Sequence, residues 1–556
     1  MALSKKFNSP KILIIGLDGA CPQYLFDLAA RGKLPSLQRL IQNGASGTLL
    51  STIPPLTPTA WTSFMTGVNP GNHGLFDFIE LLPQSYGIRF TNVKSRKVPS
   101  IWKIFNEKGY RVGVYNVPMT YPPEEVQGFL ISGLDTPHKN SPFVWPPSLK
   151  KELLNTFGDI PLDPRHLGFM RSDTLRRKVL REIREIEELR SKIFLWLLKK
   201  FQPEIAMIVF TATDTVQHFF WHYADPKHSW YPGSPNEFSM AIEDIYIFVD
   251  QLVGLLLTAL TDSANKTHIV IMSDHGFGPT SRFVFYPNRF LRRLKLLHLK
   301  QESTYLSRMD NFLRRVLPPW IKTRLSSWIP ILRVWWEKKA SVLSEMDWKN
   351  TKAFAVEILA IPLGFWINSR EVFPQGVVKD ALEYEKVVKT IIGELRKLEI
   401  RAFHRDEVYR GPYIQLAPDI VIDWWEDGLV FGRSFPAPIE APIIEEHVAR
   451  KDRPAEWSGT HRREGIFIFC GPQIKPGLNT NAEMEDIAPT IFSLLGESIP
   501  AHFEGRILEE IMTKVFKQIE YNVSKNQKNS KTDTETTYSD KESEAIQRKL
   551  KSLGYL

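Results

Sequence analysis

The sequence contains little cysteine, and its first apolar run is short. Its 556 residues include only Cys21 and Cys470, too few for a disulfide framework. This scarcity favours a reducing compartment. The first apolar run, ILIIGL, is shorter than the ~7–15 apolar residues of a signal peptide and far shorter than a membrane span. We therefore expect a cytoplasmic protein.

The charge balance gives little specific information about partners. Lysine and arginine total 71 against 62 acidic residues, a net charge of +9 that is moderate for this length. Such a surplus suits phosphates or an anionic membrane surface. No nucleic-acid-binding motif accompanies it, so we expect no nucleic-acid partner. Peripheral membrane contact stays open as a second expectation.

Apolar runs that end in polar residues predict the fold class. Residues 12–17 form such a run, and EIAMIVFTATD and THIVIMSDHG repeat the design. Helical patterns at residues 172–200 and 237–260 separate them. Strands alternating with helices predict an α/β fold with a largely parallel central sheet flanked by helices. Because ligands bind beyond the carboxyl ends of such strands, we expect a site near their terminal aspartates, Asp18, Asp214 and Asp274.

The amino-acid composition of the chain changes after residue 286. We expect a catalytic core over residues 1–286, an inserted cap over 287–350, a second part of the core over 351–515, and a polar linker with a C-terminal helix over 516–556. The cap is basic, tryptophan-rich and helical in its spacing. It suits a lid over the site, which we favour, or a contact with an anionic bilayer.

Carboxylates and imidazoles gather at the predicted strand ends. The motif DTVQH places Asp214 and His218 four residues apart on one helix face, and SDHG places Asp274 beside His275. His461 is expected in a loop before the strand GIFIFCG, and Asp18 ends the first strand. Mixed oxygen and imidazole ligands suit zinc or manganese. Two such ions, ~4 Å apart, can promote displacement at phosphorus.

The segment TPTAWTSFMTG contains a candidate nucleophile. Proline is favoured in the first turn of a helix, so Pro58 makes Thr57 the expected N-cap. A hydroxyl at that position lies where backbone N–H groups can receive a phosphate, and nearby metals would activate it. The segment has four other hydroxyl side chains, and we expect them to pack against neighbours or face solvent: Thr59, Thr62, Ser63 and Thr66.

These motifs, in this order, resemble the type I phosphodiesterase and nucleotide pyrophosphatase family of the alkaline phosphatase superfamily. The stretches that carry the resemblance are GLDGA, PPLTPTAWTSFMTGVNPGNHG, TDTVQH, SDHGFGP, GTHRREGIFIFCGP, IAPTIFSLLG with FEGRIL, and LKSLGYL. The resemblance implies an alkaline phosphatase-like fold and phosphodiester or pyrophosphate hydrolysis. It also implies two divalent ions, usually zinc, one held by Asp214, His218 and His461, and the other by Asp18, Thr57, Asp274 and His275.

One position departs from the family pattern. Nucleotide-cleaving members carry a phosphate-binding asparagine after the HGxxD aspartate, but here Phe78 follows Asp77. This change puts a nucleotide substrate in doubt and leaves a small phosphate ester as the expected substrate. His222, one turn after His218, is a second candidate for the substrate pocket, although its aromatic-rich surroundings favour packing.

Other functions stay open at this stage. A sulfatase is disfavoured because neither cysteine begins a C-x-P-x-R motif. A phosphomonoesterase or phosphomutase of the same superfamily would use similar metal ligands. A different class, a basic membrane-surface-binding protein with a vestigial site, depends on the cap alone.

Overall fold

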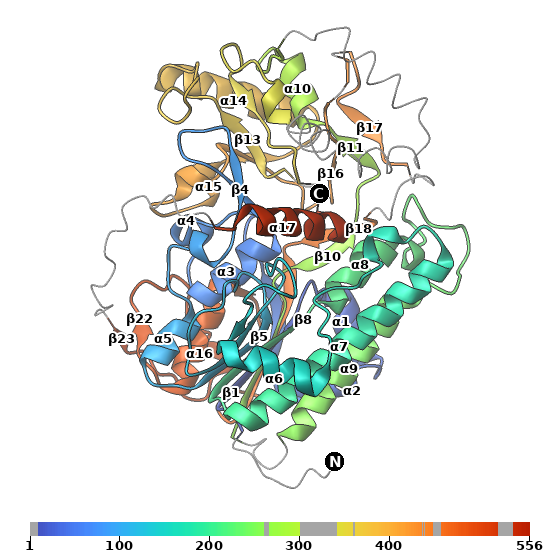
Figure 1. Ribbon diagram of the computed structural model, residues 1–556, viewed down its shortest axis with the longest axis vertical. Helices are drawn as coiled ribbons and strands as arrows, with labels where there is room; N and C mark the ends of the chain where they lie inside the picture. Colours follow the sequence, from blue (N-terminus) through green and yellow to red (C-terminus); the bar gives the residue numbers. More distant parts are fainter. Residues whose placement is uncertain are drawn as a thin grey trace.

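The computed structural model describes residues 9–260, 266–300, 342–359, 362–435, 437–438, 440–448, 457–520 and 537–555. A large central sheet lies between helices on both faces, and a smaller unit lies beyond the carboxyl ends of its strands (Figure 1). Among the described helices, none has the length and apolar character needed to cross a bilayer.

The central sheet confirms the predicted α/β class. Within the described residues it has ten strands in the order β20-β2-β19-β9-β1-β8-β5-β6-β7, with β21 beside β2. The core strands β9, β1, β8, β5 and β6 run parallel, whereas β19 is antiparallel to β9 and β2. Their bounds are β1 Ile12–Leu17, β2 Gly44–Leu50, β5 Val112–Val117, β6 Gly128–Ser132, β7 Val144–Trp145, β8 Ile205–Phe210, β9 His268–Met272, β19 Glu464–Cys470, β20 Leu478–Asn479 and β21 Ala482–Glu483.

The strands are buried on both sides, which explains their continuous apolar sequences. On β1, Leu13 and Ile15 join one hydrophobic cluster, while Ile12 and Ile14 join the other. One face is covered by α1 Pro22–Ala30, α2 Pro35–Asn43, α6 Pro147–Phe157, α7 Asp173–Phe201, α8 Ala212–Ala224 and α9 Ala241–Ala259. The other is covered by α3 Thr57–Thr66, α5 Ile101–Glu107 and α16 Ile487–Leu495.

The chain does not return to the central sheet at residue 351, where the second part of the core was expected. Residues 353–422 instead build a separate sheet, β12-β13-β15-β14, with its own hydrophobic cluster. The central sheet resumes only at β19. The helices and strands of this smaller unit are β11 Phe283–Phe285, α10 Pro287–Arg293, β12 Ala353–Phe354, β13 Gly364–Ile367, α14 Ala381–Lys397, β14 Ala402–His404, α15 Arg405–Val408, β15 Ile420–Ile422, β16 Val430–Phe431 and β17 Ile444–Glu446.

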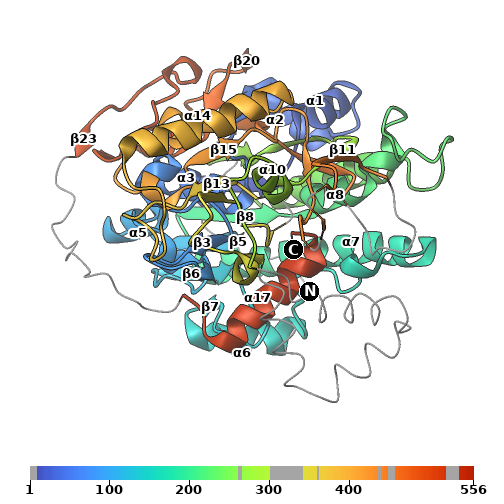
Figure 2. The same ribbon diagram turned by 90° about the horizontal axis from the view of Figure 1, so that it is seen from above.

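Two predicted segments lie largely outside the described residues. Of the cap at 287–350, the structure describes 287–300, which contains α10, and 342–350, so the lid and membrane interpretations of its tryptophans stay untested. Of the polar linker, residues 521–536 are outside as well. The C-terminal helix is present as α17 Asp540–Leu553 and lies across the carboxyl ends of the central strands (Figures 1 and 2). Further short elements are α4 Pro70–His73, β3 Ile79–Leu81, β4 Ile88–Phe90, β22 Ile499–Pro500 and β23 Ile519–Glu520.

Candidate active site

Three aspartates meet at the carboxyl edge of the central sheet. Asp18 directly follows β1, and Asp274 lies two residues beyond the end of β9. Asp214 differs from the prediction, because β8 ends at Phe210 and Asp214 belongs to the first turn of α8. Since β9, β1 and β8 are neighbours, the predicted convergence of these carboxylates is present in the structure.

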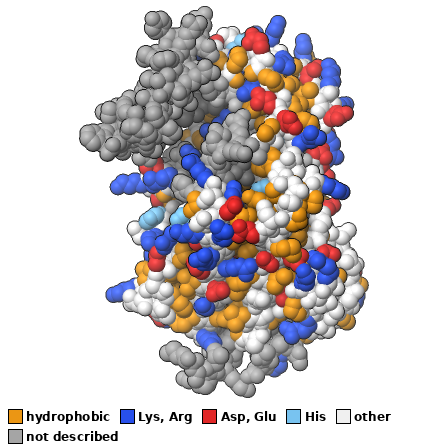
Figure 3. Space-filling view, turned by 90° about the vertical axis from the view of Figure 1, so that its right-hand side faces the viewer, with side chains coloured by type: hydrophobic (Ala, Val, Ile, Leu, Met, Phe, Trp, Pro, Cys, Tyr) orange, Lys and Arg blue, Asp and Glu red, His pale blue; other side chains and the backbone are white. Residues whose placement is uncertain are grey.

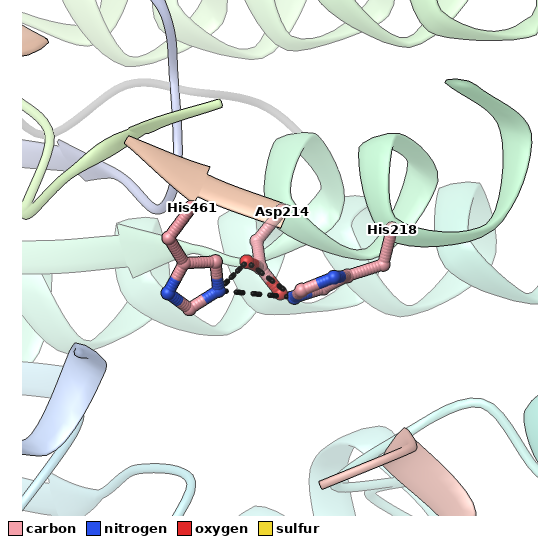
Figure 4. A group of neighbouring side chains, drawn as sticks. All are labelled: Asp214, His218 and His461. Atoms are coloured by element: carbon pink, nitrogen blue, oxygen red, sulfur yellow. Dashed lines mark hydrogen bonds and ion pairs between the residues drawn. The ribbon is translucent and has the colours of Figure 1, made fainter. Parts of the chain in front are cut away.

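Asp214, His218 and His461 form one compact cluster, here called the Asp214 group (Figure 4). Nε2 of His218 lies 3.3 Å from Oδ1 of Asp214, and Nε2 of His461 lies 3.5 Å from the same oxygen. His461 was expected in a loop, but it belongs to β18 Gly459–Arg462, which pairs with β10 Gly276–Pro279. This pairing fixes its backbone beside the strand ends.

Asp18, Asp274 and His275 form a second cluster, here called the Asp18 group. Nε2 of His275 lies 3.3 Å from Oδ2 of Asp274 and 3.8 Å from Oδ1 of Asp18. The ring of His275 stacks on that of His461, with centroids 3.6 Å apart. The two groups are therefore adjacent halves of one site.

The three imidazoles share one hydrogen-bonding pattern. Nδ1 of His218 lies 3.0 Å from the Gly459 carbonyl, Nδ1 of His461 lies 2.8 Å from that of Pro55, and Nδ1 of His275 lies 3.1 Å from that of Gly276. A carbonyl only accepts, so each Nδ1 donates, and each neutral ring presents an Nε2 lone pair to the site.

This pattern makes two lone pairs face each other. Nε2 of His218 and Nε2 of His461 are 3.1 Å apart. When both rings are neutral, neither atom carries a proton to share, so the contact is repulsive unless a cation lies against both. Metal-ligating histidines characteristically hold their other ring nitrogen on a carbonyl or carboxylate in this way.

The carboxylates show a matching arrangement. Oδ2 of Asp18 accepts from Nε1 of Trp61 at 3.4 Å, and Oδ1 of Asp274 accepts from the Gly19 amide at 3.1 Å. Within the described part of the chain, Oδ1 of Asp18, Oδ2 of Asp274 and Oδ1 of Asp214 are buried without a hydrogen-bond partner. Buried oxygens of this kind require a partner, and imidazole and carboxylate donors together fit a divalent ion such as zinc.

The electrostatics of the carboxyl groups support the same fit. Burial raises the pKa of Asp274 to about 8, and burial together with the charges of Asp274 and Asp214 raises the pKa of Asp18 well above its usual value. Burial would also raise the pKa of Asp214, but positive charge on His218 and His461, when these imidazoles are protonated, offsets it and holds that pKa low. A divalent cation would stabilise all three carboxylates in their charged form.

Thr57 lies against the Asp18 group. It is the first residue of α3 rather than its N-cap, because Leu56 has the extended backbone of the capping position and Thr57 already has helical geometry. Its Oγ1 lies 3.3 Å from Nε2 of His275, and because that nitrogen bears the lone pair, the hydroxyl donates. The other threonines of α3 instead donate to backbone carbonyls. Thr59 donates to that of Phe76, Thr62 to that of Pro58, and Thr66 to that of Thr62.

Comparison with known proteins places this site in a family. Residues 12–339 match the family model of type I phosphodiesterase / nucleotide pyrophosphatase. The chain belongs to this family. The match covers the predicted site residues up to His275 and ends before His461, which the structure brings together with Asp214 and His218.

Two similar solved structures are both of murine ectonucleotide pyrophosphatase / phosphodiesterase 5. One is an inactive form in complex with AMP, which shares 14% identity at a TM-score of 0.49 and covers 91% of this chain and 100% of its own. The other shares 13% identity at a TM-score of 0.48 and covers 90% of this chain and 100% of its own. No curated protein matches the chain.

Membership in the type I phosphodiesterase / nucleotide pyrophosphatase family supports phosphodiester or pyrophosphate hydrolysis. Members of this family typically depend on divalent metal ions. The Asp214 and Asp18 groups are candidate clusters for such ions.

The two candidate substrate residues occupy different surroundings. Phe78 is buried, and its ring lies 4.8 Å from that of Tyr555. His222 packs against the ring of Tyr223, with ring centroids 3.9 Å apart, and neither His222 nor Phe78 is among the residues that line the cavity at Thr57. The surroundings of His222 are therefore those of a packed side chain.

Sequence reasoning missed two aromatic residues beside the site. Trp457 stacks on the ring of His218, with centroids 3.6 Å apart, and Tyr555 lines the cavity at Thr57. The terminal stretch LKSLGYL gave a signal for Tyr555, since it carried part of the family resemblance and a helical pattern. Trp457 gave none, because nothing in its neighbourhood marks it as close to α8.

Proposed function

We propose that this chain is a metal-dependent hydrolase of phosphodiesters or pyrophosphates, with Thr57 as its nucleophile. The observation that supports this most is the facing pair of Nε2 atoms on His218 and His461, 3.1 Å apart beside an unpartnered oxygen of Asp214. Only a positive charge relieves that contact, and the hydroxyl of Thr57 lies at the adjacent Asp18 group.

Two divalent ions would be held by the two groups. The Asp214 group would hold one ion, and Asp18, Asp274, His275 and Thr57 would hold the other. Such ions lower the pKa of a bound hydroxyl and neutralise charge on phosphoryl oxygens. Zinc suits the mixed carboxylate and imidazole set, with manganese as the second choice.

The residues of the chain would then carry out a double displacement. Oγ1 of Thr57 gives up its proton and attacks phosphorus, the bond to the leaving oxygen breaks, and that oxygen takes up one proton as it departs. Water next attacks the phosphorus of phospho-Thr57, which releases the phosphate product and restores the hydroxyl. The amino-terminal end of α3, where Thr57 lies, favours the anionic phosphoryl group throughout.

A Thr57→Ala variant tests this proposal directly. Metal-loaded protein should hydrolyse bis-nitrophenyl phosphate and a nitrophenyl nucleotide ester faster than nitrophenyl phosphate or nitrophenyl sulfate. Thr57→Ala should lower kcat by about 10³-fold or more while retaining fold and metal, because it removes the attacking atom.

Thr59→Ala is the matched control. Thr59 lies in the same helical turn, but its hydroxyl donates to the Phe76 carbonyl at 2.7 Å. Retention of full turnover by Thr57→Ala would assign the chemistry to another residue. A preference for the monoester would favour a phosphomonoesterase of the same superfamily.

A further inference from the structure

Tyr555 is brought to the site by a helix that is firmly anchored elsewhere. Before α17 begins, Oη of Tyr538 donates to the Asp135 carbonyl at 2.8 Å. Near its end, Nζ of Lys549 lies 2.9 Å from a carboxylate oxygen of Asp163. The apolar face of α17 is buried in the core of the larger unit through Ile546, Leu550 and Leu553.

The exit from α17 turns the chain into the site. Gly554 has a left-handed φ of +91°, and a Cβ there would lie 2.3 Å from Nε1 of Trp457. That indole nitrogen donates to the Leu553 carbonyl at 3.0 Å. Glycine is therefore required at this position for both its backbone angle and the close approach of the indole.

Tyr555 lines the same cavity as the proposed nucleophile. It lines one cavity with Asp18, Thr57, Asp214 and His218, and only about 30 Å³ of free space remains there. Its ring lies 4.8 Å from that of Phe78 and 4.9 Å from that of Trp457.

This geometry supplies a donor where a phosphoryl group would be. Phosphoryl oxygens bonded through phosphorus to Oγ1 of Thr57 would lie close to that atom, within the cavity that Tyr555 also lines. A tyrosine hydroxyl is a neutral donor at ordinary pH, and donors of this kind favour anionic oxygens.

We propose that Tyr555 is a substrate-binding residue, whose hydroxyl donates to a phosphoryl oxygen while its ring, supported by those of Phe78 and Trp457, forms a wall that the ester group packs against. The inference rests on the proposed role of Thr57. It also assigns α17 a direct part in the active site, although α17 lies far from the core motifs in the sequence.

The test compares Tyr555→Phe with Tyr538→Phe in the full-length, metal-loaded protein. Tyr555→Phe keeps the ring and should lower kcat/KM for bis-nitrophenyl phosphate by about 10- to 100-fold, the range for a hydrogen bond to a charged group. It should weaken binding of inorganic phosphate, measured by calorimetry, to a similar extent. Tyr538→Phe removes a comparable buried hydroxyl of the same segment and should stay within about twofold of wild type.

The results separate this inference from the proposed function. A rise in kcat/KM for Tyr555→Phe or Tyr555→Ala would overturn it, because the residue would then be an inhibitory plug. Unchanged turnover and phosphate binding in both variants would overturn it as well. Full activity of Thr57→Ala instead contradicts the proposed nucleophile, and the loss of phosphate binding in Tyr555→Phe would still support the contact.

Discussion

His73 should make the stability of the protein depend on pH. It is fully buried, with Nε2 3.0 Å from Oγ of Ser63 in α3, and its Nδ1 accepts from the Leu75 amide at 3.2 Å. The neutral ring therefore carries its proton on Nε2, and a second proton would have to enter at Nδ1 against an amide donor. Burial, assisted by the charge of Arg96, lowers the pKa of His73 to about 3.

The sign and size of the effect follow from this depressed pKa. In the unfolded chain the group titrates near its ordinary value of 6.5, so between pH 6.5 and 3 the unfolded state binds more protons. The contribution to the free energy of unfolding is complete above pH 6.5 and falls as the pH is lowered. Below pH 6.5 the free energy of unfolding falls by an amount that approaches about 1.4 kcal/mol per pH unit. Between pH 8 and 5 the total decrease from His73 is about 2 kcal/mol.

Urea unfolding at pH 8, 6.5 and 5, followed by tryptophan fluorescence, measures this dependence. His73→Asn keeps an acceptor for the Leu75 amide but cannot titrate, so its apparent free energy of unfolding should fall about 2 kcal/mol less than that of wild type over this range. His138→Asn, at an exposed histidine, controls for the substitution itself. Parallel curves for wild type and His73→Asn would refute the reasoning.

Two further predictions concern the metals and the cavity wall. Elemental analysis should find up to two divalent ions per chain, and Asp214→Asn and Asp274→Asn should each lower that number by removing a ligand of a different group; an unchanged content in both variants would contradict the two-metal site. Arg190 lines the cavity at Thr57 and pairs with the buried Glu187 at 2.9 Å, so Arg190→Ala should destabilise the protein by about 3–5 kcal/mol in urea unfolding, because it leaves a buried carboxylate unpaired. A loss below about 1 kcal/mol would show that solvent reaches Glu187.

The sequence predicted the edge of the sheet well, because the signal there is local. A buried parallel strand must be apolar throughout and must end where polar residues begin, so β1 was predicted with the bounds the structure has. The same rule placed Asp18 and Asp274 at the site. It misplaced Asp214 by one element, because apolar sequence cannot show that β8 stops at Phe210 and that a helix starts two residues later.

Features that depend on contacts between distant segments could not be predicted in this way. The strands of the smaller unit are two to four residues long, too short to show a periodicity. The pairing of β18 with β10, which positions His461, joins segments about 180 residues apart. Tyr555 depends on the docking of α17, and neither the helical pattern nor the family resemblance of that stretch showed which part of the molecule it contacts.

The site owes its geometry mainly to the main chain. The three histidines are oriented by carbonyl groups of Gly459, Pro55 and Gly276, and Asp274 is oriented by the amide of Gly19. These partners persist whatever side chains surround them, so the ligand atoms stay directed into the site even when no cation balances them. Each of these side chains uses one polar atom to fix its orientation and directs the other into the site, an arrangement that raises affinity for a cation by removing the need to reorganise on binding.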